Sequence, residues 1–206
     1  LGAAVLVYPT ASAWFSAWGH GSDVNGYVER VQQLPDAETT SLLAAAERYN
    51  GDLPAGPLRD PWALGADGSQ TAIGEGTEAY FDALRIDGTA AMARVRIPSI
   101  HVDLPIFHGT SDATLLEGVG HLEGTSLPVG GPDSRSVLTA HRGLADATMF
   151  THLDRAQVGD TFVVEVMGEV LTYRVRDYQV IEPEQTEMLL AEPGADLITL
   201  VTCTPL

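Results

Sequence analysis

The most restrictive feature of this sequence is a series of short apolar and β-branched stretches, separated by turn-forming residues, that begins at Ala93. The stretches typical of strands are 93–97, 102–107, 136–140, 161–167, 170–181 and 196–202. Between them we expect a short helical turn at 114–119 and a helical connection at 182–190. Several short strands with intervening turns indicate a closed or nearly closed β-barrel, so the predicted fold class is mostly β.

Two amphipathic helices, forming a helical hairpin, are predicted before the barrel. Ser22 or Asp23 would cap the first helix, because short polar side chains accept hydrogen bonds from free backbone N–H groups. Its apolar residues recur at helical spacing: Val24, Tyr27, Val28 and Val31. The second helix follows Pro35-Asp36, ends at Asn50-Gly51 and carries an inward face of Leu42, Leu43, Ala46 and Tyr49.

Residues 1–18 are apolar and aromatic and carry no charge, but they are too short and too interrupted to span a bilayer, which takes about 20 apolar residues. One interpretation is the outer end of a membrane-spanning helix, with Trp14, Phe15 and Trp18 at the interface. The other interpretation is a helix packed on the domain. The first is favoured, because the sequence opens at Leu1 without an initiator methionine.

A loop rich in glycine and proline follows the helical hairpin, from Gly51 to Gly68. Loops of this length without secondary structure are typically lids, binding loops or linkers. We therefore divide the chain into an apolar N-terminal segment, a helical region, a loop and a barrel domain, over residues 1–18, 19–51, 52–75 and 76–206.

The charge balance argues against several classes of partner. The formal net charge is −17, and all eleven basic residues are arginine. Such a chain is a poor match for nucleic acid, whose affinity comes largely from basic contacts to phosphate, and for anionic membrane surfaces. The absence of lysine reflects either a coding bias or an enzyme that avoids modifying itself because it uses lysine amines as acceptors. The coding bias is the stronger explanation.

Cys203 is the only thiol, which excludes an intrachain disulfide. It lies at the end of the strand predicted at 196–202, and Pro205 then stops the ladder because proline has no N–H to donate. A lone cysteine is more often an inert buried hydrophobe than a nucleophile. A thiol at a strand end is nevertheless well placed for chemistry, because the sheet holds it while the loop leaves it open to a ligand.

His141 is the best candidate for a base that acts with Cys203. It ends the predicted strand 136–140 just as Cys203 ends its own strand, so the two side chains could converge as a Cys/His pair. A cationic imidazole beside the thiol would favour the thiolate, which is the attacking species.

The other histidines are interpreted as structural or surface residues. We expect His20 in a solvated turn, His101 and His108 at the surface or in turns, and His121 and His152 in structural hydrogen bonds. No pair of histidines has the close spacing of a zinc site, and there is no second cysteine. We therefore expect no metal ion and no cofactor.

Several motifs follow one another in a distinctive order. They are R-I-P-S-I-H-V-D-L-P-I-F-H-G-T, G-V-G-H-L-E-G-T-S-L-P-V-G-G, V-L-T-A-H-R-G-L, V-I-E-P-E-Q-T-E-M-L-L and I-T-L-V-T-C-T-P, between Ala93 and Leu206. This ordered set resembles the sortases, cysteine transpeptidases of Gram-positive cell surfaces. With the helical N-terminus and D-P-W at 60–62, the chain is most similar to class C, pilin-polymerising sortases. The resemblance implies a sortase-type β-barrel with an N-terminal helical hairpin and a lid loop.

By this resemblance, Cys203 would open the Thr–Gly bond of an LPxTG-type sorting signal, and His141 would protonate the leaving amine and later deprotonate the incoming one. A thioester would link the two steps, and a pilin lysine would attack it to give an isopeptide bond. The implied partners are pilin subunits, and the implied location is the extracellular face of the cell membrane, with the enzyme anchored there. The substrate groove would include Thr139, Ala140, Ile181, Thr186 and Thr202.

The resemblance also implies inhibition by a lid. Trp62 would sit over Cys203, Asp60 would pair with the family's catalytic arginine, and Pro61 would stiffen the turn between them. On composition alone, Trp62 would simply anchor a long loop to the barrel.

The family's catalytic arginine lies on the strand after the cysteine, so we expect this arginine and the last barrel strand beyond Leu206. Arg142 is a poor substitute, because it matches a family position beside the histidine. Three other functions remain open: a cell-wall-anchoring sortase, a cysteine hydrolase and a non-catalytic β-barrel binding module. D-P-W and the helical N-terminus argue against the first of these.

Overall fold

The structure is a computed structural model that describes residues 19–53, 78–143, 148–182 and 185–204. The apolar segment 1–18 and the predicted lid residues Asp60, Pro61 and Trp62 lie outside this part of the chain. Within it, two long helices come first, and all the strands follow from residue 93 onward.

A seven-stranded sheet forms the centre of the molecule. Its strands are β1 (Ala93–Ile97), β2 (Val102–His108), β3 (Val119–His121), β4 (Ser134–Thr139), β5 (Thr161–Val166), β6 (Glu169–Arg174) and β7 (Asp196–Val201). They are hydrogen-bonded in the order β6-β5-β1-β2-β3-β4-β7, with β2–β3 and β4–β7 parallel. The Tyr173 hydroxyl of β6 donates to the Asp196 carboxylate of β7 at 2.9 Å, which links the two edge strands. The predicted mostly β, nearly closed barrel is confirmed.

Strand β1 shows how the sequence builds the barrel wall. Its residues alternate between buried and partly exposed, as expected of a strand with one face on a core. On the outer face, Arg94 contacts Asp103 of β2 at 2.6 Å and Glu165 of β5 at 3.1 Å. Such partly exposed ion pairs contribute little stability, so the buried face and the backbone ladder hold these three strands together.

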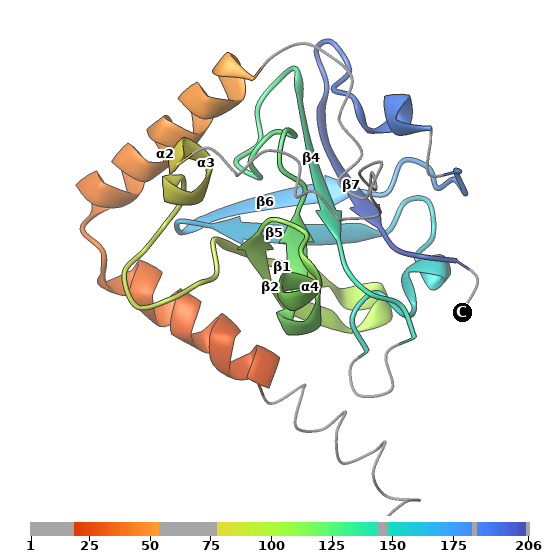
Figure 1. The fold of residues 1–206 in the computed structure, drawn as a ribbon, viewed down its shortest axis with the longest axis horizontal. Helices are drawn as coiled ribbons and strands as arrows, with labels where there is room; N and C mark the ends of the chain where they lie inside the picture. The colour runs from red at the N-terminus through yellow and green to blue at the C-terminus, as the bar shows by residue number, and fades with distance from the viewer. Residues whose placement is uncertain (1–18, 54–77, 144–147, 183–184, 205–206) are drawn as a thin grey trace, which may run out of the picture.

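The two long helices lie along one side of the barrel, at the left of Figure 1. They are a helix described over residues 19–33 and α2 (Asp36–Asp52). Tyr27 docks the first helix, because its buried hydroxyl accepts a hydrogen bond from the Met167 N–H at 2.9 Å. Asn50 docks the second, donating to the Leu127 carbonyl at 3.1 Å and accepting from the Leu127 N–H at 2.7 Å. The predicted pair of helices is therefore present and is fixed to the barrel.

Two expectations for the first helix are wrong. The chain is already helical at residue 19, so Ser22 and Asp23 lie inside the helix and not at its cap. His20, expected in a solvated turn, is buried in the same helix, and this burial lowers the pKa of its imidazole. The flanking glycines suggested a turn, but packing of the helix on the barrel overrides that local preference.

The sequence also mispredicted where several elements end. Strand β6 ends at Arg174 and not at 181, opposite Thr161, where its partner β5 begins. Beyond it, Val175 still donates to the Asp160 carbonyl at 2.8 Å and accepts from the Gly159 N–H at 2.9 Å. The predicted helical connection shortens to a single 3-10 turn at Thr186–Leu189. Two short helices, α3 (Glu78–Asp82) and α4 (Asp112–Glu117), accompany the strands. Neither α3 nor strand β3 was predicted, and α4 begins two residues earlier than expected.

Candidate active site

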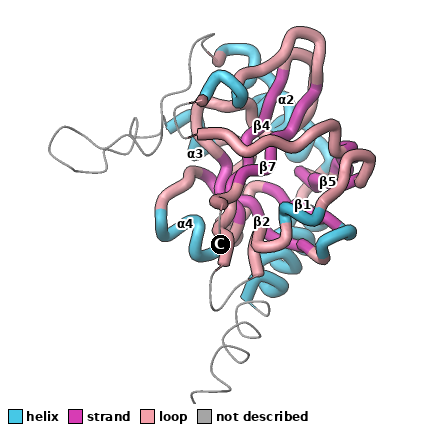
Figure 2. The backbone as a smooth tube through the Cα atoms, turned by 90° about the vertical axis from the view of Figure 1, so that its right-hand side faces the viewer, coloured by secondary structure: helices cyan, strands magenta, loops and turns pink. Residues whose placement is uncertain are grey.

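The candidate site lies where strands β4 and β7 end. The two strands run parallel and side by side, with Thr139 paired with Val201 at their ends (Figure 2). Because parallel strands point the same way, the residues that follow them emerge at the same edge of the sheet. Those residues carry His141 after β4 and Cys203 after β7.

Pairing between the two segments continues past the strands. The Ala140 N–H donates to the Val201 carbonyl at 3.2 Å. In return, the Thr202 hydroxyl donates to the Ala140 carbonyl at 2.9 Å. Ala140 is buried and Thr202 is half-buried, so these bonds lie partly away from water.

One further contact lies beyond the two candidate residues. The Arg142 guanidinium donates to the Thr204 hydroxyl at 3.3 Å. His141 and Cys203 each follow the last paired residues, Thr139 and Val201, by two positions, and the segments that carry them are joined by the bonds of Ala140 and Arg142. The convergence of the two side chains and their chemical roles stay predictions.

The two candidate side chains are accessible to different degrees. Cys203 is exposed, while His141 is half-buried. The His141 carbonyl accepts a hydrogen bond from the Phe150 N–H at 3.1 Å, which fixes the backbone that carries the imidazole. An exposed thiol is open to a substrate that arrives from solvent, as nucleophilic attack requires.

The predicted groove residues fall into two groups. Thr139, Ala140 and Thr202 lie at the ends of β4 and β7 beside the candidate pair. Ile181 and Thr186 lie on the connection between β6 and β7, both half-buried. Their part in binding a substrate stays a prediction.

A cluster of charged residues, which sequence reasoning missed, fixes the base of the β6–β7 connection. Glu192 accepts hydrogen bonds from Arg176 at 2.8 and 2.9 Å and from Arg135 of β4 at 2.7 Å. Arg176, with Arg135, lowers the pKa of the Glu192 carboxyl to about 2. Arg135 also donates to the Thr199 hydroxyl of β7 at 2.9 Å. No short motif marks these residues, because they meet only when the β4–β7 register is formed.

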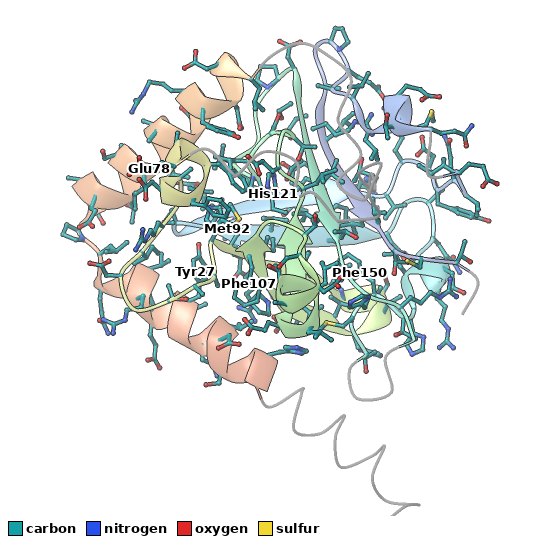
Figure 3. The ribbon with its side chains drawn as sticks, viewed as in Figure 1. Tyr27, Glu78, Met92, Phe107, His121 and Phe150 are labelled. Atoms are coloured by element: carbon teal, nitrogen blue, oxygen red, sulfur yellow. The ribbon has the colours of Figure 1, made fainter. Side chains whose placement is uncertain are left out.

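His121 has the structural role that the sequence predicted. Its ring is fully buried, near the middle of the molecule in Figure 3. Nε2 lies 2.9 Å from the Ser126 carbonyl and donates there. The Tyr80 hydroxyl donates to the His121 carbonyl at 3.0 Å and lies 3.0 Å from Nδ1. The same hydroxyl accepts from the Gly109 N–H at 2.9 Å. Burial lowers the pKa of the His121 imidazole to about 4.

Two more histidines differ in their surroundings. His101 is an exposed turn residue with φ of 57°, as expected. His108 is the last residue of β2 and is half-buried, with Nε2 2.8 Å from the Ala83 carbonyl, so it is not the surface residue expected. Burial lowers the pKa of its imidazole.

The described residues contain no group of three or more histidine, cysteine, aspartate or glutamate side chains placed to hold a metal ion. A cavity of about 430 Å³ is lined by residues of α3, α4 and β2, among them Phe81, Phe107 and Glu117. It does not include Cys203 or His141.

Among the helices of residues 19–53, 78–143, 148–182 and 185–204, none is long and apolar enough to cross a membrane.

Comparison with known proteins agrees with this geometry. The sortase domain family matches residues 95–206. Sortase C-1 from Actinomyces oris is 49% identical, with 81% of this chain and 90% of that chain covered and a TM-score of 0.72. Streptococcus pneumoniae sortase C, whose structure is described as informing catalysis and pilin substrate specificity, is 35% identical, with 88% and 87% covered and a TM-score of 0.77.

A curated relative, sortase A of Streptococcus agalactiae serotype III (strain NEM316), is 29% identical over 53% of this chain and 45% of its own length. The chain spans about half the length of the curated relatives it matches. The family match covers more than half of the chain and includes both strand ends described above. The chain therefore belongs to the sortase family, and class C sortases are among the solved structures that it resembles.

Proposed function

We propose that this protein is a pilus-assembly cysteine transpeptidase that cleaves an LPxTG-type sorting signal and transfers it to a pilin lysine. The observation that carries the proposal is the parallel pairing of β4 and β7, whose last pair, Thr139 and Val201, precedes His141 and Cys203 by two residues. Membership of the sortase family supports the reaction class. The likeness to Streptococcus pneumoniae sortase C, a protein connected with pilin substrate specificity, supports the choice of pilin.

The reaction needs a thiolate and a proton donor on the same side of the substrate. The Cys203 sulfur attacks the threonine carbonyl, and the Thr–Gly C–N bond breaks as His141 gives a proton to the leaving glycine amine. A thioester then joins the substrate to Cys203. A lysine amine attacks this thioester, loses a proton to His141 and forms the isopeptide bond, and Cys203 leaves as the thiolate.

The β6–β7 connection supports an apolar subsite for the sorting signal. It carries exposed large apolar side chains, namely Tyr178, Val180 and Met188. Leu and Pro of an LPxTG-type signal are apolar and would pack against such a surface. In this arrangement Ile181 and Thr186 line one wall of the groove. Thr139, Ala140 and Thr202 line the part of the groove next to Cys203.

The proposal includes an extracellular, membrane-anchored location and a lid. Class C resemblance supports both, and the lid residues Asp60, Pro61 and Trp62 lie outside the described part of the chain. If Trp62 covers Cys203, Trp62→Ala speeds alkylation of the thiol by iodoacetamide. An unchanged rate in that variant would remove the lid from the proposal and leave the transfer reaction in place.

Mass spectrometry of the products tests the reaction class. The protein is incubated with an LPxTG-type peptide, with and without a peptide that carries a free lysine amine. We expect an isopeptide-linked product that needs both peptides and Cys203. A free acid formed at the same rate with or without the amine would instead identify a cysteine hydrolase. Preference for a cell-wall peptide amine would identify an anchoring sortase, and peptide binding that survives Cys203→Ala without any product would identify a binding module.

A further inference from the structure

Arg142 links the segment that carries His141 to the segment that carries Cys203. It directly follows His141, and its guanidinium contacts Thr204, which directly follows Cys203. The Nη1 group donates to the Thr204 hydroxyl at 3.3 Å, and Nη2 donates to the Asp154 carboxylate at 3.0 Å. Only 10% of the Arg142 side chain is exposed. One nearly buried cation thus joins the end of the β7 segment to the segment that carries the histidine.

Besides the contact with Asp154, two hydrogen bonds join the segment that carries His141 to residues 150–154. The Phe150 N–H donates to the His141 carbonyl at 3.1 Å. The Gly143 N–H donates to the Thr151 hydroxyl at 3.1 Å. These two hydrogen bonds join residues 141–143 to residues 150–154, and the ion pair between Arg142 and Asp154 adds a third contact.

We propose that Arg142 is a positioning residue that holds the Cys203 segment in register with His141. This inference rests on the proposed function, because it assumes that the two side chains react as a pair. Arg142 acts through Thr204 and Asp154 and does not touch the substrate. The guanidinium ties the segments 141–143 and 150–154, which are near each other in the sequence, to the distant segment 202–204.

The chemistry of arginine suits this task. A guanidinium presents donors in a rigid planar fork, so it bonds two acceptors on different segments at once, whereas a lysine ammonium is a point charge on a flexible stem. The carboxylate of Asp154 keeps the charge paired, and low exposure limits competition from water. Cys203 and Thr204 are themselves exposed, so few other contacts restrain them.

A direct role for Arg142 in stabilising the substrate's oxyanion fits the geometry less well. Both Nη groups are already engaged with protein acceptors. Nε is buried and has no acceptor within the described part of the chain. The bonds to Thr204 and Asp154 hold the guanidinium, and the second N–H of each Nη belongs to a side chain that is only 10% exposed.

Three substitutions separate positioning from the other roles. Arg142→Met keeps most of the stem but removes the fork, Thr204→Val removes the acceptor at similar volume, and Thr204→Ser keeps the hydroxyl. Arg155→Met serves as the matched control, because Arg155 is an exposed arginine on the turn that carries Asp154. For each protein we would measure kcat and KM for transfer of an LPxTG-type peptide, the thermal midpoint, and the pH profile of Cys203 alkylation by iodoacetamide.

We expect Arg142→Met to lower kcat by roughly tenfold to a hundredfold with KM nearly unchanged, because a small displacement of reacting groups costs rate and not binding. Its alkylation profile should shift toward that of His141→Ala, because the thiolate loses its imidazolium partner. Thr204→Val should show a smaller loss of kcat, which Thr204→Ser restores. Arg155→Met should behave as the wild type.

The inference is overturned if Arg142→Met keeps the wild-type kcat and alkylation profile, or if it raises KM alone, which would mean that Arg142 binds substrate. If Arg142→Met does not fold, the Thr204 pair decides, and equal kcat for Thr204→Val and Thr204→Ser contradicts positioning. Failure of the proposed function looks different. In that case the wild type itself makes no product, and His141→Ala leaves its alkylation profile unchanged.

Discussion

Two histidines at neighbouring strands have opposite surroundings. His121 ends β3, is fully buried, and has hydrogen-bond partners at both ring nitrogens, Tyr80 and Ser126. His141 follows β4, is half-buried, and no described residue forms a hydrogen bond with its ring. In the antiparallel pairing of β3 and β4, His121 lies opposite Leu138, three residues before His141.

The difference shows what turns a strand-end histidine into a structural or a reactive group. The His121 ring is held neutral, because burial lowers the pKa of its imidazole to about 4. It can organise its neighbours but cannot exchange protons with a substrate. The His141 backbone is fixed by the Phe150 N–H, and no described residue forms a hydrogen bond with the ring of this half-buried residue. A general acid and base needs this combination of fixed position and free nitrogens.

The largest expected effect is the loss of transfer in His141→Ala. Without an acid and base, formation of the isopeptide product should slow by at least about 100-fold, with the thermal midpoint close to the wild-type value. The rate is measured by mass spectrometry and the midpoint by circular dichroism. An active His141→Ala protein would place the acid and base elsewhere.

The opposite pattern is expected for His121→Ala. Removing this ring leaves a cavity and takes the donor away from the Ser126 carbonyl, at a cost of about 4 kcal/mol in the free energy of unfolding. Urea unfolding measures the loss. His101→Asn is the control, because His101 is exposed and asparagine tolerates its positive φ. Equal losses in the two variants would show that the buried network does not stabilise the fold.

The third expected effect is a pH dependence of the free energy of unfolding that comes from His121. Its pKa is about 4 when folded and 6.5 when unfolded, so below pH 6.5 the unfolded chain binds a proton that the folded chain does not. The free energy of unfolding therefore falls as pH drops from 6.5 toward 4, by roughly 3 kcal/mol for this group. His121→Gln does not titrate there, so its stability curve should be flatter. Parallel curves for the two proteins would refute this contribution.

The smallest effect is expected for Tyr80→Phe. This change removes one oxygen, which leaves the Gly109 N–H without its acceptor and the His121 carbonyl without its donor. The expected loss in the free energy of unfolding is about 2 kcal/mol, measured by urea unfolding. Tyr178→Phe, at an exposed tyrosine, should leave stability unchanged. A Tyr80→Phe protein as stable as the wild type would mean that water replaces the hydroxyl.

Local patterns in the sequence predicted most of the barrel but not its short elements. Strand β1 alternates clearly and ends at a proline, so its bounds were correct. Strand β3 has three residues, Val119–His121, too few to show a period. Helix α3 has five, and its position depends on Tyr80 packing in the core. The apolar run after Arg174 favoured a longer β6, but the strand ends where its partner does.

For the site, the sequence indicated that Cys203 and His141 follow strands, and this was enough to predict a pair. It did not indicate that β4 and β7 are parallel neighbours, and the register depends on that arrangement. The contacts of Arg142 with Thr204 and Asp154 were unpredictable for the same reason. Hydrogen bonds between segments so distant in sequence follow from the fold and leave no local pattern.

The central claim is that Cys203 forms a thioester with a sorting signal. Intact mass of the protein after mixing with an LPxTG-type peptide tests it most directly, in a Trp62→Ala background that would loosen the proposed lid. We predict a gain equal to the peptide minus its leaving group, which hydroxylamine removes and which Cys203→Ala abolishes. No gain in the Cys203 protein, or the same gain after Cys203→Ala, would contradict the account.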